Sequence, residues 1–313
     1  MNYELYGLRI RSEVPLGAPG DGDGAPDFEV RWGEPSPIPA ERPAGEVLAE
    51  LRLADGRGYT HTRTDSGYVL RFHGTCEVRL DPTRRSAHVH LDPDADPGLV
   101  PILLGGNVLA FILTLAGKCV LHASAVAVED RAMAFAGRAG AGKSTLAALL
   151  CAGGATLVTD DLLRLDPESG RCFWGTPEIR LRQNATTFTR HLPASAARRT
   201  ADGRHAIQFP GSPPHLARLR AVLLPRPSRT CRILRLERLS VLDAAFRLTC
   251  CGRVAGWQVR EQIRQHFEAA GRMAARIPVY EAEIPWGPPF PRGLGAALLD
   301  GVGLNGRTVE AGV

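Results

Sequence analysis

A glycine-rich segment in the middle of the chain has the residue types and spacing of a phosphate-binding loop. The run Gly137-Arg138-Ala139-Gly140-Ala141-Gly142-Lys143-Ser144 fits the pattern G-x-x-x-x-G-K-[ST] at every position, and Thr145 follows it. Glycines let successive backbone N–H groups converge on a phosphate without Cβ clashes. In this pattern the lysine places a cation on the phosphates, and the serine hydroxyl can bind Mg²⁺. Residues 137–145 are therefore predicted to bind the phosphates of a nucleotide.

The lysine of this segment stands out against the composition of the chain. Lys118 and Lys143 are the only lysines, and the other 36 of the 38 basic residues are arginines. Such arginine usage reflects compositional bias rather than function. A lysine at the one position where the pattern requires it is therefore difficult to ascribe to chance.

Two adjacent carboxylates, Asp160 and Asp161, follow Lys143 by 17 and 18 residues. A short helix and a strand are expected between them and the loop, and such a β–α–β unit brings the end of the second strand to the sheet edge that carries the loop. One carboxylate could hold Mg²⁺ while the other accepts a proton from an attacking hydroxyl. The alternative is that one of them caps a helix over residues 162–165.

His122 precedes the loop by one expected hairpin. If Glu129 and Asp130 form a two-residue turn, the pairing places His122 opposite Gly137. A histidine in an apolar strand is usually a structural core residue. At this register it could instead contact a phosphate or orient the Asp pair, and we favour that role.

The elements around these residues follow from hydrophobic patterning. Residues 99–117 carry no charge, but the stretch contains Pro101, three glycines and Asn107, which favours a buried core helix over 99–115 rather than a membrane span. Strands are expected at 120–128, 132–136, 156–159, 219–224 and 231–236. Helices are expected at 144–152, 241–248 and 259–277.

The first third of the chain has a different pattern. Short runs of alternating or β-branched residues at 3–10, 28–32, 68–72, 76–80 and 87–91 are separated by turn signals. We therefore expect an α/β chain with a β-rich N-terminal accessory region, 1–95, and a second domain, 96–313.

Composition excludes several classes of protein. With 44% hydrophobic and 23% charged residues, the chain is neither a disordered polymer nor a coiled-coil rod. A net charge of +5 is too small to imply nucleic acid. Seven cysteines without C-x-x-C spacing predict free thiols, and the N-terminus lacks the pattern of a signal peptide. We expect a cytoplasmic protein with no nucleic-acid or membrane partner.

A basic segment lies between Ile179 and Arg235, where Asp202 is the only acidic residue. Its arginines could dock an acidic acceptor, and one of them could stabilise a transferred phosphoryl group, with Arg180 and Arg204 the foremost candidates. The alternative is a solvated surface enriched in arginine by compositional bias. The arginines are at 180, 182, 190, 198, 199, 204, 218, 220, 226, 229, 232 and 235.

The motifs together resemble a known family. LHASAV at 121–126, AFAGRAGAGKSTLAALL at 134–150 and the Asp pair resemble the HPr kinase/phosphorylase superfamily, most closely the HPr-kinase-like serine kinases of bacterial biosynthetic clusters, including those beside lasso-peptide genes. GTPEIRL at 175–181 and YGLRIRSEVPL at 6–16 are also similar to segments of these kinases. Leu181 stands where the bifunctional enzymes have glycine, so the resemblance does not extend to phosphorylase activity or to HPr as the substrate.

The resemblance implies a P-loop kinase core over 96–313 that uses ATP and Mg²⁺ to phosphorylate a serine hydroxyl of a peptide or protein, such as a biosynthetic precursor peptide. The resemblance is also compatible with a homo-oligomer. By position it implies that Asp161 is the base, that Asp160 and Ser144 bind the metal, that Lys143 clamps the phosphates and that His122 assists.

Two alternatives remain at this level. One is a carboxykinase-like phosphoryl transferase acting on a small metabolite, and the other is a nucleotide-dependent regulator without catalysis. The adjacent carboxylates favour chemistry, because a regulator needs only one acid on the metal side.

Overall fold

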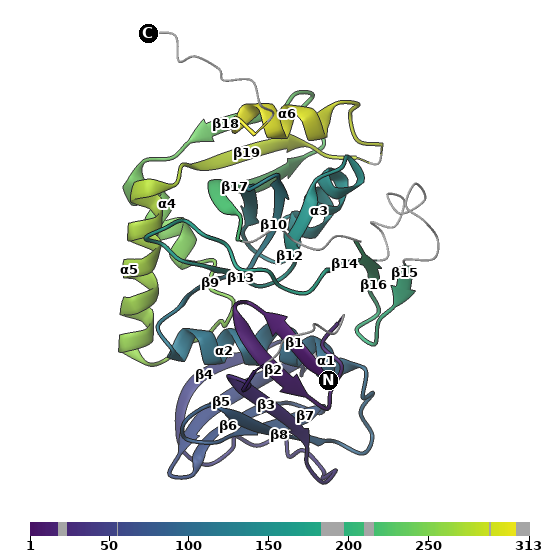
Figure 1. Cartoon of the computed structure of the whole chain (residues 1–313), viewed down its shortest axis with the longest axis vertical. Helices are drawn as coiled ribbons and strands as arrows, with labels where there is room; N and C mark the ends of the chain where they lie inside the picture. The colour runs from purple at the N-terminus through teal and green to yellow at the C-terminus, as the bar shows by residue number, and fades with distance from the viewer. Residues whose placement is uncertain (18–23, 55, 183–196, 210–215, 288, 305–313) are drawn as a thin grey trace. The chain divides into compact units, whose positions relative to one another are not determined.

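The computed structural model describes residues 1–17, 24–54, 56–182, 197–209, 216–287 and 289–304. The protein is a mixed α/β structure with several sheets (Figure 1). It divides into two compact units. Unit 1 comprises Met1–Lys118, Thr200–Asp202 and Arg253–His266, and unit 2 comprises Cys119–Arg199, Gly203–Gly252 and Phe267–Val313.

Unit 1 is built on an eight-stranded sheet in the order β1-β2-β3-β8-β7-β6-β5-β4. Its strands are β1 (Asn2–Leu5), β2 (Leu8–Ser12), β3 (Phe28–Trp32), β4 (Glu46–Arg52), β5 (Gly58–Thr64), β6 (Gly67–Phe72), β7 (Cys76–Leu80) and β8 (Ser86–Leu91). The pairs β2–β3 and β3–β8 are parallel, and the other pairs are antiparallel.

The predicted strands of this region are largely confirmed, with one error and two omissions. The single strand predicted over 3–10 is wrong, because Tyr6 and Gly7 adopt positive φ values of 55° and 67° and turn the chain into the β1–β2 hairpin. Strands β4 and β5 were not predicted. In β5 the residues Tyr59–Thr62 are all buried, so the strand lacks the alternation by which a half-exposed strand is recognised.

The apolar segment 99–115 is helical, as predicted, and it belongs to unit 1. It comprises α1 (Leu99–Leu103), the π-helical turn η1 (Leu104–Val108) and α2 (Leu109–Leu115). Every residue of η1 is buried, and so are most residues of α2, which confirms a core helix. Among the residues that the structure describes, no helix has the length and apolar character needed to cross a membrane.

An aromatic cluster with a buried histidine lies in unit 1. The His61 ring stacks on Tyr59 with a centroid distance of 4.4 Å, and its Nε2 lies 2.7 Å from Oδ1 of Asn107 in η1. The Phe111 ring meets His61 edge-on and stacks on Trp257. Because His61 is fully buried, its pKa is lowered to about 4.

Unit 2 contains a six-stranded sheet in the order β12-β10-β11-β17-β19-β18. Its strands are β10 (Ala123–Val128), β11 (Arg131–Ala136), β12 (Thr156–Thr159), β17 (Arg218–Ser228), β18 (Arg235–Arg238) and β19 (Val279–Pro285). Strand β10 is antiparallel to both of its neighbours, β11 and β12. The β10–β11 register around Glu129 and Asp130 is the predicted one, with Val128 opposite Arg131 and Ala123 opposite Ala136.

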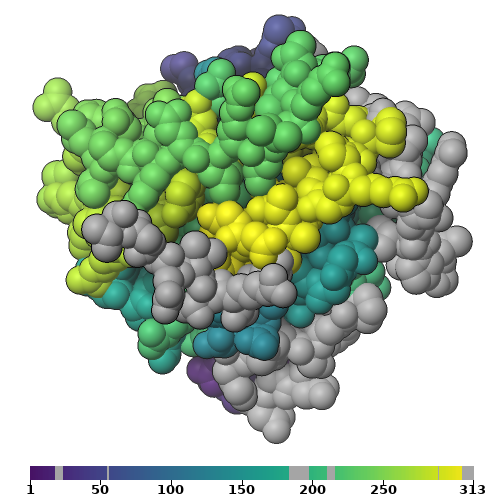
Figure 2. Space-filling model, turned by 90° about the horizontal axis from the view of Figure 1, so that it is seen from above, coloured from purple at the N-terminus to yellow at the C-terminus, as the bar shows by residue number. Residues whose placement is uncertain are grey.

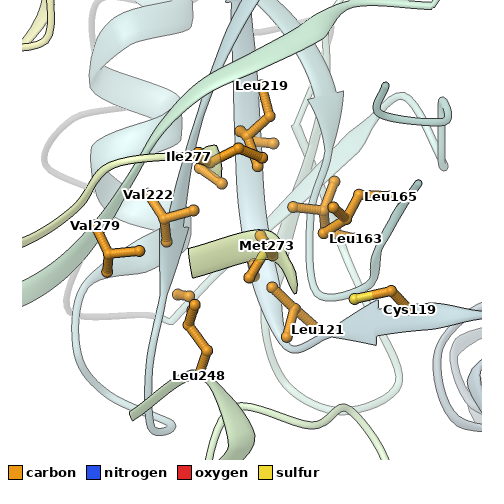
Figure 3. Close-up of a cluster of buried hydrophobic side chains, with 14 of the residues drawn as sticks. Cys119, Leu121, Leu163, Leu165, Leu219, Val222, Leu248, Met273, Ile277 and Val279 are labelled. Atoms are coloured by element: carbon orange, nitrogen blue, oxygen red, sulfur yellow. The ribbon is translucent and has the colours of Figure 1, made fainter. Parts of the chain in front are cut away.

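Helices cover both faces of this sheet. Leu248 of α4 (Val241–Thr249) and Met273 of α5 (Arg260–Arg276) pack on the face that carries Val222 and Val279 (Figure 3). On the opposite face, α3 (Lys143–Ala152) and α6 (Leu294–Gly301) pack together, and Figure 2 shows the yellow C-terminal segment beside the teal segment that includes α3. Both faces of the central strands are therefore buried, which explains their nearly continuous apolar sequence.

Smaller elements complete unit 2. A two-stranded sheet pairs β9 (Cys119–Leu121) with β13 (Leu163–Leu165). A three-stranded sheet has the order β14-β16-β15, formed by β14 (Glu178–Leu181), β16 (His205–Gln208) and β15 (Ala197–Arg199). All seven cysteines are free, as predicted.

The buried histidine makes a prediction about pH. The folded-state pKa of His61, about 4, lies below the ordinary value of 6.5, so protonation favours the unfolded chain. Relative to acidic pH, the folded state with a neutral His61 is favoured above pH 6.5, and this stabilisation is lost as the pH falls toward 4. The pKa difference amounts to about 3 kcal/mol of unfolding free energy.

His61→Gln keeps an amide donor for Asn107 but cannot titrate. In chemical denaturation followed by tryptophan fluorescence, the wild type is expected to lose about 3 kcal/mol more than the variant between pH 7.5 and pH 4. A stability difference between the two proteins that does not change with pH would contradict this account.

Candidate functional site

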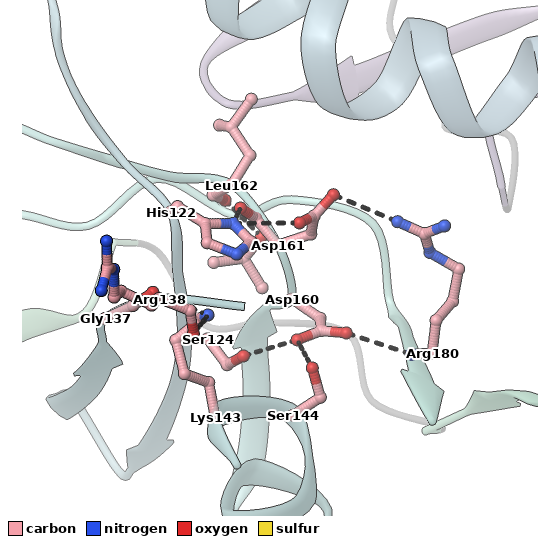
Figure 4. A network of polar contacts seen from close by, with 11 residues as sticks. His122, Ser124, Gly137, Arg138, Lys143, Ser144, Asp160, Asp161, Leu162 and Arg180 are labelled. Carbon is pink, nitrogen blue, oxygen red and sulfur yellow. Dashed lines mark hydrogen bonds and ion pairs between the residues drawn. The ribbon is translucent and has the colours of Figure 1, made fainter. Parts of the chain in front are cut away.

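Three strand ends of the six-stranded sheet bring the predicted residues together. Strand β11 runs into the glycine-rich loop, Gly137–Gly142, and β12 runs into Asp160 and Asp161, while His122 directly precedes β10. Because β10 is antiparallel to both β11 and β12, its start lies at the same sheet edge as their ends. Figure 4 shows the resulting group of polar side chains.

Three glycines of the glycine-rich loop adopt positive φ values. Gly137, Gly140 and Gly142 have φ values of 143°, 87° and 86°, in the region that favours glycine. Gly142 is the N-cap of α3, and no side chain caps that helix. The first N–H groups of α3 and the positive end of its dipole therefore face the loop. The crest of the loop, Arg138–Gly140, is exposed.

Lys143 is folded back along this loop. Its Nζ donates hydrogen bonds to the carbonyl oxygens of Gly137, at 2.9 Å, and Arg138, at 3.0 Å. Only 6% of the residue is exposed, so these carbonyl groups replace water around the ammonium group. The ammonium group thus lies inside the curve of the loop (Figure 4).

The carboxylate of Asp160 accepts hydrogen bonds from three elements. Its Oδ1 accepts from Ser124 Oγ of β10 at 2.5 Å and from Ser144 Oγ of α3 at 2.8 Å. Its Oδ2 accepts from the backbone N–H of Arg180 in β14 at 3.0 Å. Asp160 is 5% exposed. A buried carboxylate is stable only when it is bonded in this way.

Asp161 has different partners. Its Oδ1 lies 3.1 Å from Nδ1 of His122, and its Oδ2 lies 3.1 Å from the Arg180 guanidinium. Its φ of 76° is in the left-handed region, which aspartate tolerates better than most residues. The side chain is 16% exposed. The two neighbouring carboxylates therefore point to different partners and are not equivalent (Figure 4).

His122 lies at a break in the strand predicted over 120–128, which is in fact β9 followed by β10. Its backbone N–H donates to the Cys251 carbonyl at 2.7 Å instead of entering the β10–β11 ladder. That ladder ends at Ala123 and Ala136, one pair before His122 and Gly137. The His122 side chain lies at the Asp161 end of the polar group (Figure 4).

The alternative prediction of a helix over residues 162–165 is wrong, because Leu163–Leu165 form strand β13. Its Leu163 and Leu165 are buried in the core of unit 2, and this burial favours pairing with β9 over a helical turn. The Asp pair therefore does not cap a helix there.

The oxygen atoms of Asp160 and of the neighbouring Ser144 suit a hard cation as metal ligands. Mg²⁺ prefers oxygen ligands and is often held by one or two carboxylates together with substrate phosphates and water. Ser144 Oγ and the Asp160 carboxylate are such ligands, 2.8 Å apart beside the loop. In the part of the chain that the structure describes, no group of three His, Cys, Asp or Glu side chains could hold a metal by itself.

The Cys251 thiol is not an activated nucleophile. Cys251, whose carbonyl contacts His122, has its thiol pKa raised to about 11 by burial. The thiol is therefore protonated at neutral pH and is a poor nucleophile.

The sequence did not single out Ser124, and it did not predict the pairing of Arg180 with Asp161. A single hydroxyl in the apolar run of β10 was the available signal for Ser124. Arg180, a candidate for contact with a transferred phosphoryl group, is paired with Asp161. Arg204 directly precedes β16, and Arg190 lies outside the described residues.

No protein-family model matches the chain, and no curated protein matches it significantly. What the site does must therefore be inferred from its residues and their geometry.

The loop supports a prediction with a matched control. A Cβ at Gly142 would lie 2.2 Å from Cη2 of Trp286, whereas a Cβ at Gly140 would meet nothing within 4 Å. The two φ values are nearly equal, so each Gly→Ala change adds the same left-handed strain, about 1–2 kcal/mol. Only Gly142→Ala must also displace an indole ring.

Gly142→Ala is therefore expected to lower the melting temperature more than Gly140→Ala, and Trp286→Ala in the same chain should recover part of the difference. Differential scanning fluorimetry of the three variants tests this. Equal losses for the two single glycine variants would show that Trp286 does not constrain the loop.

Proposed function

We propose that this protein is an ATP-dependent kinase with a P-loop core that phosphorylates a serine hydroxyl of a peptide or protein. The observation that carries the proposal is the pair of differently bonded carboxylates beside the glycine-rich loop. Asp160 is bonded to the serine of the loop motif, and Asp161 is bonded to His122 and Arg180. Phosphoryl transfer needs both a metal-side acid and a proton acceptor at such a place.

The loop and Lys143 would bind the nucleotide phosphates. Backbone N–H groups of the loop and the N-terminus of α3 favour an anion there. Lys143 already lies within the loop, so it can exchange two carbonyl partners for phosphate oxygens without a large movement. Ser144 and Asp160 would hold Mg²⁺, which neutralises phosphate charge when bound.

Asp161 is assigned as the general base. In the transfer, the acceptor oxygen forms a bond to the γ-phosphorus, the bond from phosphorus to the leaving diphosphate breaks, and the hydroxyl proton moves to the carboxylate of Asp161. The Arg180 guanidinium donates to Oδ2 of this carboxylate. His122 Nδ1 lies 3.1 Å from Oδ1 and 3.0 Å from the Asp161 backbone carbonyl oxygen, to which it is hydrogen-bonded, so both residues hold Asp161 in place. Asp160 is less suited to this role, because it is 5% exposed and is hydrogen-bonded to Ser144 of the loop motif, whereas the Asp161 side chain is 16% exposed.

Arginines on one face of the three-stranded sheet support an acidic acceptor. Arg180, Ala206 and Arg198 lie directly opposite one another across β14, β16 and β15, so their side chains share a face. The Arg198 side chain is 63% exposed and pairs with Glu178. Ile179 and Ile207, which alternate with these residues, are buried on the other face. The Arg180 side chain is 13% exposed and paired with Asp161, so Arg198 is the more accessible of the two arginines to an acidic peptide.

A purely regulatory nucleotide switch is less well supported. Such a protein needs phosphate and metal ligands but no second oriented carboxylate. The contacts of Asp161 with His122 and Arg180 thus favour catalysis.

The two lysines of the chain provide a direct test of nucleotide binding. Lys143→Ala removes the cation from the loop and is expected to lower ATP affinity and transfer by orders of magnitude. Lys118→Ala removes the only other lysine, which is exposed, and should leave both unchanged. Fluorescent-nucleotide binding and transfer of labelled phosphate from ATP are the measurements. Equal behaviour of the two variants would rule out the loop as the nucleotide site.

Asparagine substitutions separate the roles of the Asp pair. Asparagine tolerates positive φ, so Asp161→Asn removes the charge without adding backbone strain. It is expected to keep Mg·ATP affinity within a few-fold and to slow single-turnover transfer by about 10²–10⁴-fold. Asp160→Asn should instead raise the Mg²⁺ concentration required.

The opposite pattern, with ATP binding lost in Asp161→Asn and only transfer lost in Asp160→Asn, would exchange the two roles. Normal transfer by both variants would overturn the kinase mechanism.

A further inference from the structure

Ser124 has a contact that neither the folding of β10 nor the proposed base requires. It is fully buried in the interior of the six-stranded sheet, and the other residues of its strand are alanines and valines. Its Oγ lies 2.5 Å from Oδ1 of Asp160. A buried hydroxyl without a hydrogen-bond partner is unfavourable, so the Asp160 carboxylate stabilises a serine at this position.

The hydrogen bonds of Asp160 are unevenly divided between its two oxygens. A carboxylate offers about four lone-pair sites. Oδ1 accepts from both Ser124 and Ser144, whereas Oδ2 accepts only from the Arg180 N–H. Both sites on Oδ1 are therefore taken by hydroxyl protons, and one site remains on Oδ2.

We propose that Ser124 is a positioning residue that limits Asp160 to a one-oxygen metal ligand and thereby makes the site select Mg²⁺ over Ca²⁺. The inference rests on the proposed function. Ca²⁺ accepts bidentate carboxylates and variable coordination, whereas Mg²⁺ demands near-octahedral geometry and keeps several waters. A carboxylate with one oxygen blocked disfavours bidentate coordination and so acts against Ca²⁺.

Ser124→Ala tests this by opening one lone-pair site on Oδ1 while Ser144 and Arg180 keep their bonds. Binding of Mg²⁺ and of Ca²⁺ in the presence of ADP is measured by isothermal titration calorimetry, without turnover. Loss of an outer-shell partner typically lowers metal affinity about 10–100-fold. We expect a loss of this size for Mg²⁺ and a smaller loss, or a gain, for Ca²⁺, so that the ratio of the two affinities shifts toward Ca²⁺.

Two further variants separate positioning from general stability. Ser124→Thr retains the hydroxyl and should keep the ratio of the wild type. Thr62→Val removes a fully buried hydroxyl in unit 1 and should also leave the ratio unchanged. If Ser124→Ala does not fold, Ser124→Cys, whose thiol is a weaker donor, should shift the ratio in the same direction.

The possible failures are distinguishable. If the wild type binds Mg²⁺ with ADP but Ser124→Ala changes both metal affinities by the same factor, or changes neither, the inference about Ser124 is overturned and the kinase proposal stands. If the wild type binds neither ADP nor either metal with it, the proposed nucleotide site fails, and the role of Ser124 fails with it.

Discussion

The buried carboxylate of Asp160 is the constraint on which the site depends. A negative charge with 5% exposure must be hydrogen-bonded on both oxygens, and here the donors come from β10, α3 and β14. These elements meet only because β10 is inserted antiparallel between β11 and β12. One hydrogen-bonding requirement thus links the order of the sheet to the position of the glycine-rich loop.

Asp160 and Asp161 are adjacent in the chain but lie in different environments at this edge of the six-stranded sheet. Asp160 points into the interior, toward two hydroxyls and a backbone N–H. The positive φ of Asp161 turns its carboxylate to the more exposed side, toward His122 and Arg180. Arg180 contacts both residues, Asp160 through its backbone and Asp161 through its guanidinium. A change in the path of β14 would therefore disturb both carboxylates together.

The loop is constrained from outside as well as from within. Lys143 bonds two loop carbonyls from the inside, and Trp286, directly after β19, packs against Gly142. Strands β11, β17 and β19 are parallel, so the end of β19 reaches the same sheet edge as the loop. Gly142, the second glycine of the motif, thus meets two requirements, a positive φ and close contact with an indole ring.

Local features of the chain were predictable from the sequence. The loop motif, the α3 helix that begins with it, the buried helix over 99–115 and the β10–β11 register all depend on residues close to one another in the chain. The break at His122, the strand β13 and the bonds from Ser124 and Arg180 to Asp160 were not predictable. Those two bonds join residues 36 and 20 positions apart, and they form only when distant strands pair in one order. Sequence periodicity reports which residues are buried, whereas sheet order and hydrogen-bond satisfaction in the folded chain decide which of them meet.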